Sequence, residues 1–311
     1  MVMLGKLFYQ EKGTFLQSLH PVAVLLYLVA LLLTALLFSH PLYLSGVLLI
    51  AVLAIISSDA LENWEMYLKI SLPMILLIAL VNPLVAHAGK TILWYGPQIP
   101  FLGRFTISLE AVCYGFAMGV RLLAVLSIFC LYNAVVHPDR VLHLFSRFAY
   151  KSALVVSLAT RMLPQMNREL KNIQDVQKVR GVDFESKSFK ERVKNYFRLV
   201  NILLLSSLEG ALQIAEAMQS RAFGSGPRSF YRREPVKPRD IICLASSGLA
   251  LIAAIFAKIK GAGDYTYYPQ LGYLIEDFRS LIVLSVILIG AFVPVGLSWG
   301  WNCCPYLRSK I

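Results

Sequence analysis

The sequence predicts an all-α, polytopic membrane protein that carries a cytoplasmic module of helices. Three observations support this prediction. Hydrophobic residues fill 57% of the 311 positions, charged residues fill only 15%, and the mean hydropathy is +0.63. A soluble domain of this length would need more charge to cover its surface. Apolar runs long enough to cross a bilayer recur along the chain, and one basic stretch between them has helical periodicity.

Six apolar runs supply the expected membrane helices. About 20 residues of α-helix cross the hydrocarbon core, so the second and fifth runs are short for this task. The first run begins late and merges with the second across His40-Pro41, which argues against a cleavable signal peptide. We therefore expect about six transmembrane helices, give or take one. The runs are Val22–Phe38, Leu42–Ile56, Ile70–Ala86, Ala111–Val136, Ile241–Ala257 and Leu281–Trp299.

Positive charge is concentrated between the fourth and fifth runs. Residues 137–240 hold 19 of the 30 lysines and arginines and 10 of the 18 acidic residues, which is +9 of the net +12. Positive segments tend to stay in the cytoplasm, and this orientation places both chain ends there too. Orientation and attraction to membrane lipid headgroups account for the charge. No nucleic-acid partner is expected, because no aromatic-basic interleaving accompanies it.

These features divide the chain into three predicted parts. Residues 1–136 form an N-terminal membrane domain of about four transmembrane helices, and residues 241–311 form a C-terminal membrane segment of about two. Residues 137–240 form the cytoplasmic or interfacial module. The module therefore interrupts the membrane-embedded part of the chain.

The module is predicted to contain three helices. Ser152–Leu163 is moderately apolar and can lie at the membrane surface. Pro164 can begin a second helix, because proline is tolerated in a first helical turn, and Gly181 supplies a stop after Arg180. A charged, solvated stretch is expected from Val182 to Lys194.

The third helix of the module is predicted over Leu199–Ala222, with a glycine-rich stop at Gly224–Pro227. Apolar residues on it recur at spacings of three and four, which places them on one face of the helix. This face either packs into a core or offers an apolar contact for a membrane partner. Its members are Leu205, Leu208, Leu212, Ala215 and Met218.

Two helices of the module end on an arginine between small or slim residues. The first ends on Val179-Arg180-Gly181 and the second on Ser220-Arg221-Ala222. Such an arginine projects from the helix terminus, and slim neighbours let another protein approach the backbone. The pair therefore indicates two docking sites. The alternative is that each arginine only complements the negative end of its helix, worth about 0.3–1 kcal/mol at an exposed terminus.

The sequence offers no sign of a metal site, a cofactor or a nucleotide loop. The five histidines show no His-x-x-x-His or His-Glu pairing, and the five cysteines form no Cys-x-x-Cys. Gly89-Lys90-Thr91 resembles the end of a phosphate-binding loop, but Leu84 stands where the first glycine is required, in a predicted external loop. We expect no ATP binding by this chain.

Three stretches resemble the transmembrane T component of energy-coupling factor transporters, which are vitamin and metal importers of the ATP-binding cassette class. They are Ala159–Pro164, Gln177–Gly181 and Glu216–Gly224, and weaker similarity runs from about Leu7 to Asp240. In that family, two coupling helices end in Ala-Arg-Ala or Ala-Arg-Gly signatures that seat in grooves of two cytoplasmic ATPases. The resemblance implies that role for Arg180 and Arg221. The flanking positions are Val179, Gly181, Ser220 and Ala222, with Val179 and Ser220 replacing the usual alanine.

The resemblance implies a coupling subunit that is not itself an enzyme. Its partners would be two cytoplasmic ABC ATPases, a separate substrate-binding membrane protein and membrane lipid. ATP binding and hydrolysis would reorient the substrate-binding subunit for uptake of a vitamin or a transition-metal ion. The location implied is a prokaryotic inner membrane. The last apolar run, Leu281–Trp299, lies beyond the matched pattern.

Two other function classes compete with this interpretation. A membrane-embedded transferase or protease would have Arg121 and the external Tyr265–Tyr268 cluster as its only candidates, without a nucleophile, an acid-base pair or a metal set. A channel or secondary transporter is third, because the runs are poor in Asp, Glu and Lys. Arg121 is too costly to face lipid unpaired, so we expect either a structural ion pair inside the bundle or a transport role.

Overall fold

The computed structural model describes residues 12–85, 89–99, 103–145, 149–184, 188–226, 236–261, 263–273 and 278–303. The chain divides into two compact units. The membrane unit comprises residues 1–141 and 235–311, and the helical module comprises residues 142–234. The division falls within a few residues of the predicted boundaries at 137 and 240.

All six predicted apolar runs are helices of the membrane unit. Proline occupies the first turn of three of them, where its missing amide hydrogen is not needed. The side chains of His20 and His40 accept hydrogen bonds from the amides of Val22 and Leu42 and so cap two helices. The helices are α3 (Pro21–Leu37), α4 (Pro41–Ser57), α5 (Leu61–Val85), α6 (Leu109–Val135), α10 (Pro238–Ile259) and α11 (Phe278–Cys303), with the short α2 (Phe15–Ser18) before them.

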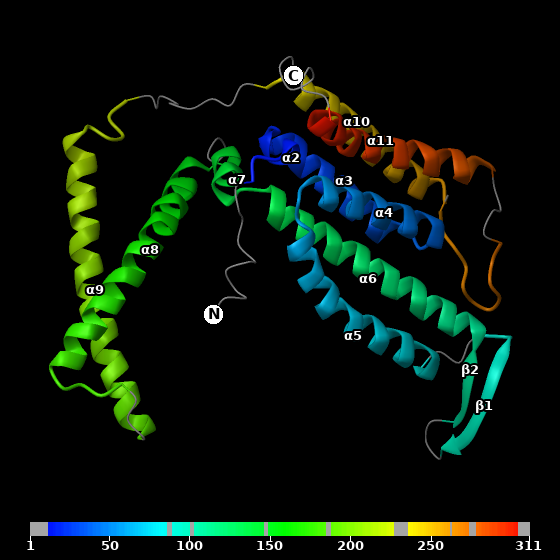
Figure 1. The fold of residues 1–311 in the computed structure, drawn as a ribbon, viewed down its shortest axis with the longest axis horizontal. Coiled ribbons are helices and arrows are strands. Elements are labelled where there is room, and N and C mark those ends of the chain that lie inside the picture. The colour runs from blue at the N-terminus through cyan, green and yellow to red at the C-terminus, as the bar shows by residue number, and fades with distance from the viewer. Residues whose placement is uncertain are drawn as a thin grey trace. The chain divides into compact units, whose positions relative to one another are not determined.

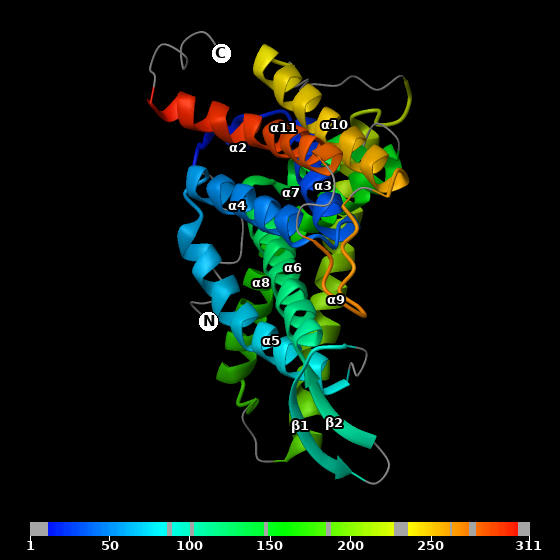
Figure 2. The ribbon, with the colours of Figure 1, turned by 90° about the vertical axis from the view of Figure 1, so that its right-hand side faces the viewer.

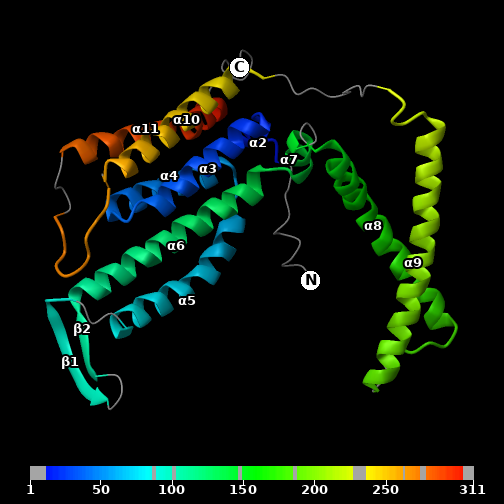
Figure 3. The same cartoon turned by 180° about the vertical axis from the view of Figure 1, so that it is seen from behind.

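The helices of the membrane unit pack in a sequence of neighbours. Helix α5 lies against α6, α6 against α3 and α4, and α10 against α3 and α11 (Figures 1 and 3). Glycine permits the close approach of α5 and α6, because a Cβ at Gly119 would lie 2.8 Å from the Ile75 side chain. Small residues at helix contacts are typical of membrane proteins, where packing rather than hydrophobicity drives association.

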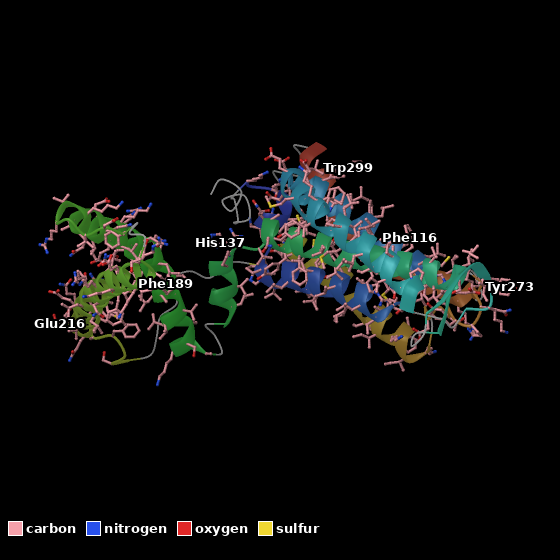
Figure 4. All side chains as sticks on the ribbon, turned by 90° about the horizontal axis from the view of Figure 1, so that it is seen from below. Phe116, His137, Phe189, Glu216, Tyr273 and Trp299 are labelled. Carbon is pink, nitrogen blue, oxygen red and sulfur yellow. The ribbon has the colours of Figure 1, made fainter. Side chains whose placement is uncertain are left out.

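The outer surface of the membrane unit is apolar, as lipid contact requires. Leu72 and Ile252 are 65% and 69% exposed, and Phe116 and Trp299 lie on the surface at 67% and 63% (Figure 4). By length and composition, five helices in the described part of the chain can cross a membrane: α5, α6, α9 (Phe189–Ser220), α10 and α11. Helices α3 and α4 are shorter apolar helices of 17 residues each.

A β-hairpin, absent from the sequence prediction, precedes α6. Strand β1 (Ile92–Ile99) pairs antiparallel with β2 (Gly103–Ser108), beside the start of α6 (Figure 2). The backbone amide and the hydroxyl of Thr91 both donate to the carboxylate of Glu110 at the base of the hairpin. The amide of Thr91 is thus occupied, and the Gly89-Lys90-Thr91 tripeptide belongs to this base.

The helical module contains two long helices where the sequence predicts three. Helix α8 (Tyr150–Val179) runs through Pro164, so the predicted break there is wrong. Proline removes one backbone hydrogen bond, and the helix continues because good helix formers follow on its carboxyl side. Helix α9 begins at Phe189, ten residues before the predicted Leu199. Lys, Glu and Arg in the charged stretch are themselves good helix formers, and Leu199 is buried.

Helices α8 and α9 cross each other within the module (Figures 1 and 3). The hydroxyl of Ser206 on α9 donates to the carboxylate of Glu169 on α8. The link between the helices packs back onto α9, because the rings of Phe184 and Tyr196 lie 5.5 Å apart. The side-chain amide of Asn195 also donates to a link carbonyl at 2.8 Å. A small internal contact thus fixes the crossing of two otherwise exposed helices.

Candidate functional site

The carboxyl end of α8 at Arg180, the first arginine tip, closes with a complete Schellman motif. In this motif two amides beyond the helix donate hydrogen bonds back into its last turn. The amide of Val182 donates to the carbonyl of Gln177 at 3.0 Å, and the amide of Gly181 donates to that of Lys178 at 3.0 Å. Arg180 is the C-cap residue, and Gly181 reverses the chain with φ +83°. The arginine therefore stands at the outer edge of a hydrogen-bonded turn.

The carboxyl end of α9 at Arg221, the second arginine tip, has the same backbone geometry. The amide of Phe223 donates to the carbonyl of Met218 at 3.0 Å, and the amide of Ala222 donates to that of Gln219 at 2.9 Å. Arg221 is again the C-cap residue of its helix. Arg180 and Arg221 thus occupy equivalent positions in two copies of one motif.

The residue that reverses the chain differs between the two tips. At the second tip it is Ala222, with φ +54°, and the predicted Gly224 lies beyond it. The left-handed region costs a residue with a Cβ roughly 1–2 kcal/mol. The glycine-rich stretch expected from Gly224 lies just past the end of α9, but Ala222 and not a glycine adopts the reversing conformation. The sequence gives no local signal for this conformation, because alanine favours the helix that it ends here.

All six predicted docking residues are exposed in the structure: Val179, Arg180, Gly181, Ser220, Arg221 and Ala222. Val179 alone is 89% exposed. Among the residues that the structure describes, neither Arg180 nor Arg221 has an ion-pair partner. Both guanidinium groups can therefore reach the carboxylates or carbonyl groups of a second protein.

The apolar face of α9 is exposed rather than packed into the module. Leu205, Leu208 and Leu212 are 73%, 62% and 65% exposed. Phe189, at the start of the helix and labelled in Figure 4, is 79% exposed. Ala215 is exposed and Met218 is half-buried. Within the described part of the module, this face has no covering element. An external contact of this face stays a prediction.

Arg121 is held by a backbone carbonyl and not by a carboxylate. Its guanidinium donates to the carbonyl of Phe38 at 2.8 Å and lies 3.5 Å from the sulfur of Met118. Phe38 caps the carboxyl end of α3, where the helix dipole is negative. The prediction of an ion pair at Arg121 is therefore wrong for the described part of the chain.

Two of the tyrosines in the Tyr265–Tyr268 cluster are structural hydrogen-bond donors. The phenol of Tyr265 donates to the carbonyl of Gly272 at 2.7 Å, and that of Tyr267 donates to the carbonyl of Ser39 at 2.8 Å. Burial raises the pKa of Tyr267 to about 12, which disfavours a role as an acid or a base near neutral pH. The described residues also contain no group of three or more His, Cys, Asp or Glu that could hold a metal ion.

The membrane unit and the two exposed tips define the class of the protein. It is a multi-pass helical membrane protein with a helical module in which two helices end on an arginine. Residues 13–231 match the family model of CbiQ, described as a cobalt transport protein. This match covers well over half of the chain, so the chain belongs to that family. The resemblance found in the sequence is confirmed.

Individual relatives point in the same direction. The energy-coupling factor transporter transmembrane protein EcfT of Bacillus subtilis is 27% identical over 198 residues, which is 60% of this chain and 71% of that protein. EcfT of Acidaminococcus fermentans is 27% identical over 163 residues, 49% of this chain and only 58% of the relative. A putative ABC transporter ATP-binding protein of Bifidobacterium longum is 25% identical over 195 residues, 59% of this chain and 24% of that protein.

Proposed function

We propose that this chain is the transmembrane coupling subunit of an energy-coupling factor importer. Two cytoplasmic ABC ATPases hold the tips at Arg180 and Arg221, and a substrate-binding membrane subunit lies beside the chain. ATP binding and hydrolysis move the ATPases, and the module passes that movement to the membrane. The transported solute is a vitamin or a transition-metal ion bound by the partner subunit. The orientation that this requires has the amino terminus and the module in the cytoplasm.

The observation that carries this proposal is the shared geometry of the two tips. Two equivalent C-cap arginines suit two copies of one kind of groove, or two similar grooves. A guanidinium presents a rigid fork of donors that suits carboxylates and carbonyl groups. Hydrogen bonds to charged groups are typically worth about 1.5–3 kcal/mol each.

Two further observations support the proposed partners. The Bifidobacterium relative, named as an ABC ATP-binding protein, devotes about a quarter of its length to a region similar to this chain. This favours an ATPase as the partner of the module. The largely exposed apolar face of α9 supports an apolar contact with the substrate-binding subunit or with lipid. Its members are Leu205, Leu208, Leu212, Ala215 and Met218.

The decisive experiment compares tip arginines with arginines elsewhere on the same helices. The tagged chain is purified from its own membranes with its bound subunits, and each subunit is identified. The double variant Arg180→Ala with Arg221→Ala should lose the ATPases and transport. The matched control is Arg168→Ala with Arg198→Ala, which removes one exposed arginine from each helix away from the tips. Normal assembly and transport of the tip variant would overturn the proposal.

The same preparation tests the expectation that the chain is not an enzyme. Freed of its partners, the chain should hydrolyse no ATP above a detergent blank. Hydrolysis that persists after contaminating ATPases have been removed would contradict a coupling role.

A further inference from the structure

The residues of the membrane unit that flank the helical module in the chain, Arg140 on one side and Arg239 and Asp240 on the other, are tied to one short segment near the amino terminus. We call this segment, residues 12–20, the brace. It contains α2 and lies beside the start of α10 and the end of α11 (Figure 1). The chain enters the module after Val141 and returns from it at Pro235. The brace contacts the membrane unit close to both of these points.

At the outgoing connection, the brace is held by Arg140 on α7 (Pro138–Phe145). The guanidinium of Arg140 donates to the carbonyl of Gln17 at 2.7 Å. The side-chain amide of Gln17 in turn donates to the carbonyl of Ala134, at the end of α6, at 2.8 Å. One residue of the brace therefore holds both the end of a membrane helix and the start of the connection that follows it.

At the returning connection, the brace is held by two buried charged residues at the start of α10. The guanidinium of Arg239 donates to the carbonyl of Ser18 at 3.1 Å. The carboxylate of Asp240 accepts from the amide of His20 at 3.1 Å and from that of Lys237 at 2.8 Å. Arg239 and Asp240 are only 4% and 3% exposed.

Aromatic rings complete the contact at Arg239. Its guanidinium lies 5.0 Å from the ring centre of Trp301 and 5.7 Å from that of Phe15, and these two rings lie 5.5 Å from each other. Arginine binds aromatic faces through its charge and its planar shape. The brace is thus fixed to α11 as well as to α10.

This arrangement is unusual for a simple packing contact. Burying charged groups is expensive, and well-packed apolar residues often hold helices together as well or better. Here the charged residues bond the backbone of three nearby brace residues, Gln17, Ser18 and His20, from the two sides of the module's insertion point. These three bonds use backbone partners in the brace, so they do not themselves depend on its side chains.

We propose that the brace holds the two connections of the module at a fixed spacing, with Arg140 and Arg239 as its positioning residues. A movement imposed on the module then reaches α6 and α10 together and is not absorbed where the chain enters and leaves the module. The consequence for transport rests on the proposed coupling function. The fixed spacing itself does not.

The test uses the assembled complex and two readouts. Spin labels are placed at exposed Leu77 on α5 and at exposed Glu216 on α9, and their distance distribution is measured. Transport per ATP hydrolysed is measured on the same variants. Arg140→Gln and Arg239→Gln should each broaden the distribution, and the double variant should broaden it most. Transport per ATP should fall by about two- to thirtyfold, the range found for changes in coupling networks.

Controls separate positioning from stability. Lys69→Ala removes an exposed ion pair with Glu65 within α5, away from the brace, and should leave both readouts unchanged. Arg239→Lys keeps a donor for Ser18 without the planar group, so it should restore transport per ATP in part. If Arg239→Gln does not accumulate in membranes, Arg140→Gln carries the test, because Arg140 is only half-buried.

An unchanged distance distribution in the double variant would overturn the proposal. A broadened distribution with unchanged transport per ATP would overturn it as well, since the fixed spacing would then serve nothing in transport. Failure of the proposed function has a different signature: the tip variants at Arg180 and Arg221 would transport normally, whatever the labels at Leu77 and Glu216 report.

Discussion

The two tips of the helical module share one backbone motif but differ in the residue that completes it. Gly181 adopts φ +83° without steric penalty, whereas Ala222 adopts φ +54° against the preference of any residue with a Cβ. The comparison shows that the motif, and not the glycine, is common to both ends. Strain kept in a native structure is typical of functional sites, so the second tip is the more informative one to perturb.

The strongest test of the comparison is topological. If the module is cytoplasmic, Lys178→Cys and Ser225→Cys lie on the same side of the membrane. In a background without native cysteines, both should react with an impermeant thiol reagent only after the cells are opened. Tyr273→Cys, at a position 80% exposed in the loop expected to face outside, should react in intact cells.

This experiment also settles how α9 is used. Helix α9 is long and apolar enough to span a membrane, and it separates the two tips in the chain. A spanning α9 would place Lys178 and Ser225 on opposite sides. Labelling of Ser225→Cys from outside would therefore break the equivalence of the tips and the coupling proposal with it.

The next largest effect concerns the arginines taken singly. Arg180→Ala and Arg221→Ala should each weaken retention of the ATPases by roughly one to two decades, the equivalent of about 1.5–3 kcal/mol. Lysine at either position should rescue only partly, because it keeps the charge and loses the fork. Retention is measured by copurification across a dilution series. Loss at one tip only would show that the two grooves differ.

Exchanging the reversing residues should have smaller effects of opposite sign. Gly181→Ala should destabilise the end of α8 by about 1–2 kcal/mol. Ala222→Gly should stabilise the end of α9 by somewhat less, about 1 kcal/mol or below, because glycine also gains entropy in the unfolded chain.

Hydrogen exchange at two amides measures this exchange of residues. The amide of Val182 reports on the first tip and that of Phe223 on the second, since each closes its turn. Faster exchange at Val182 and slower exchange at Phe223 are expected in the respective variants. If the amide of Phe223 exchanged at the same rate in Ala222→Gly as in the wild-type protein, φ at Ala222 would carry no strain.

The smallest effect is expected at Val179. This side chain is 89% exposed beside Arg180, and it is bulkier than its counterpart Ser220 at the second tip. Val179→Ala should bring the first tip closer to its groove and change ATPase retention by no more than about 0.5 kcal/mol, as for most exposed substitutions. A titration of ATPase binding with matched wild-type protein checks this. A large loss would show that the valine itself is recognised.

The membrane helices could be predicted from sequence because hydropathy is a sum over a whole run, which single residues hardly disturb. The failures depend on single residues. Pro164 removes only one hydrogen bond, and the surrounding helix outweighs it. The partner of Arg121 is a carbonyl 83 positions away, and a backbone group leaves no mark in a sequence pattern.

The candidate site was predictable in its residues but not in its geometry. The slim neighbours of Arg180 and Arg221 identified both tips, yet nothing local to Ala222 indicates a left-handed residue. That conformation emerges only when the amides of Ala222 and Phe223 find their carbonyls. The β-hairpin before α6 was missed because its apolar residues also suit a loop close to a membrane.

The contact at which α8 and α9 cross lies at unequal distances from the two tips. From the contact between Glu169 and Ser206, Arg180 lies 11 residues along α8 and Arg221 lies 15 residues along α9. At 1.5 Å per residue, these arms measure roughly 17 Å and 22 Å. If the two helices turned about this contact as rigid arms, the end of α9 at Arg221 would move about a third further than the end of α8 at Arg180. The two arginines would then be displaced by different distances in one and the same movement of the module.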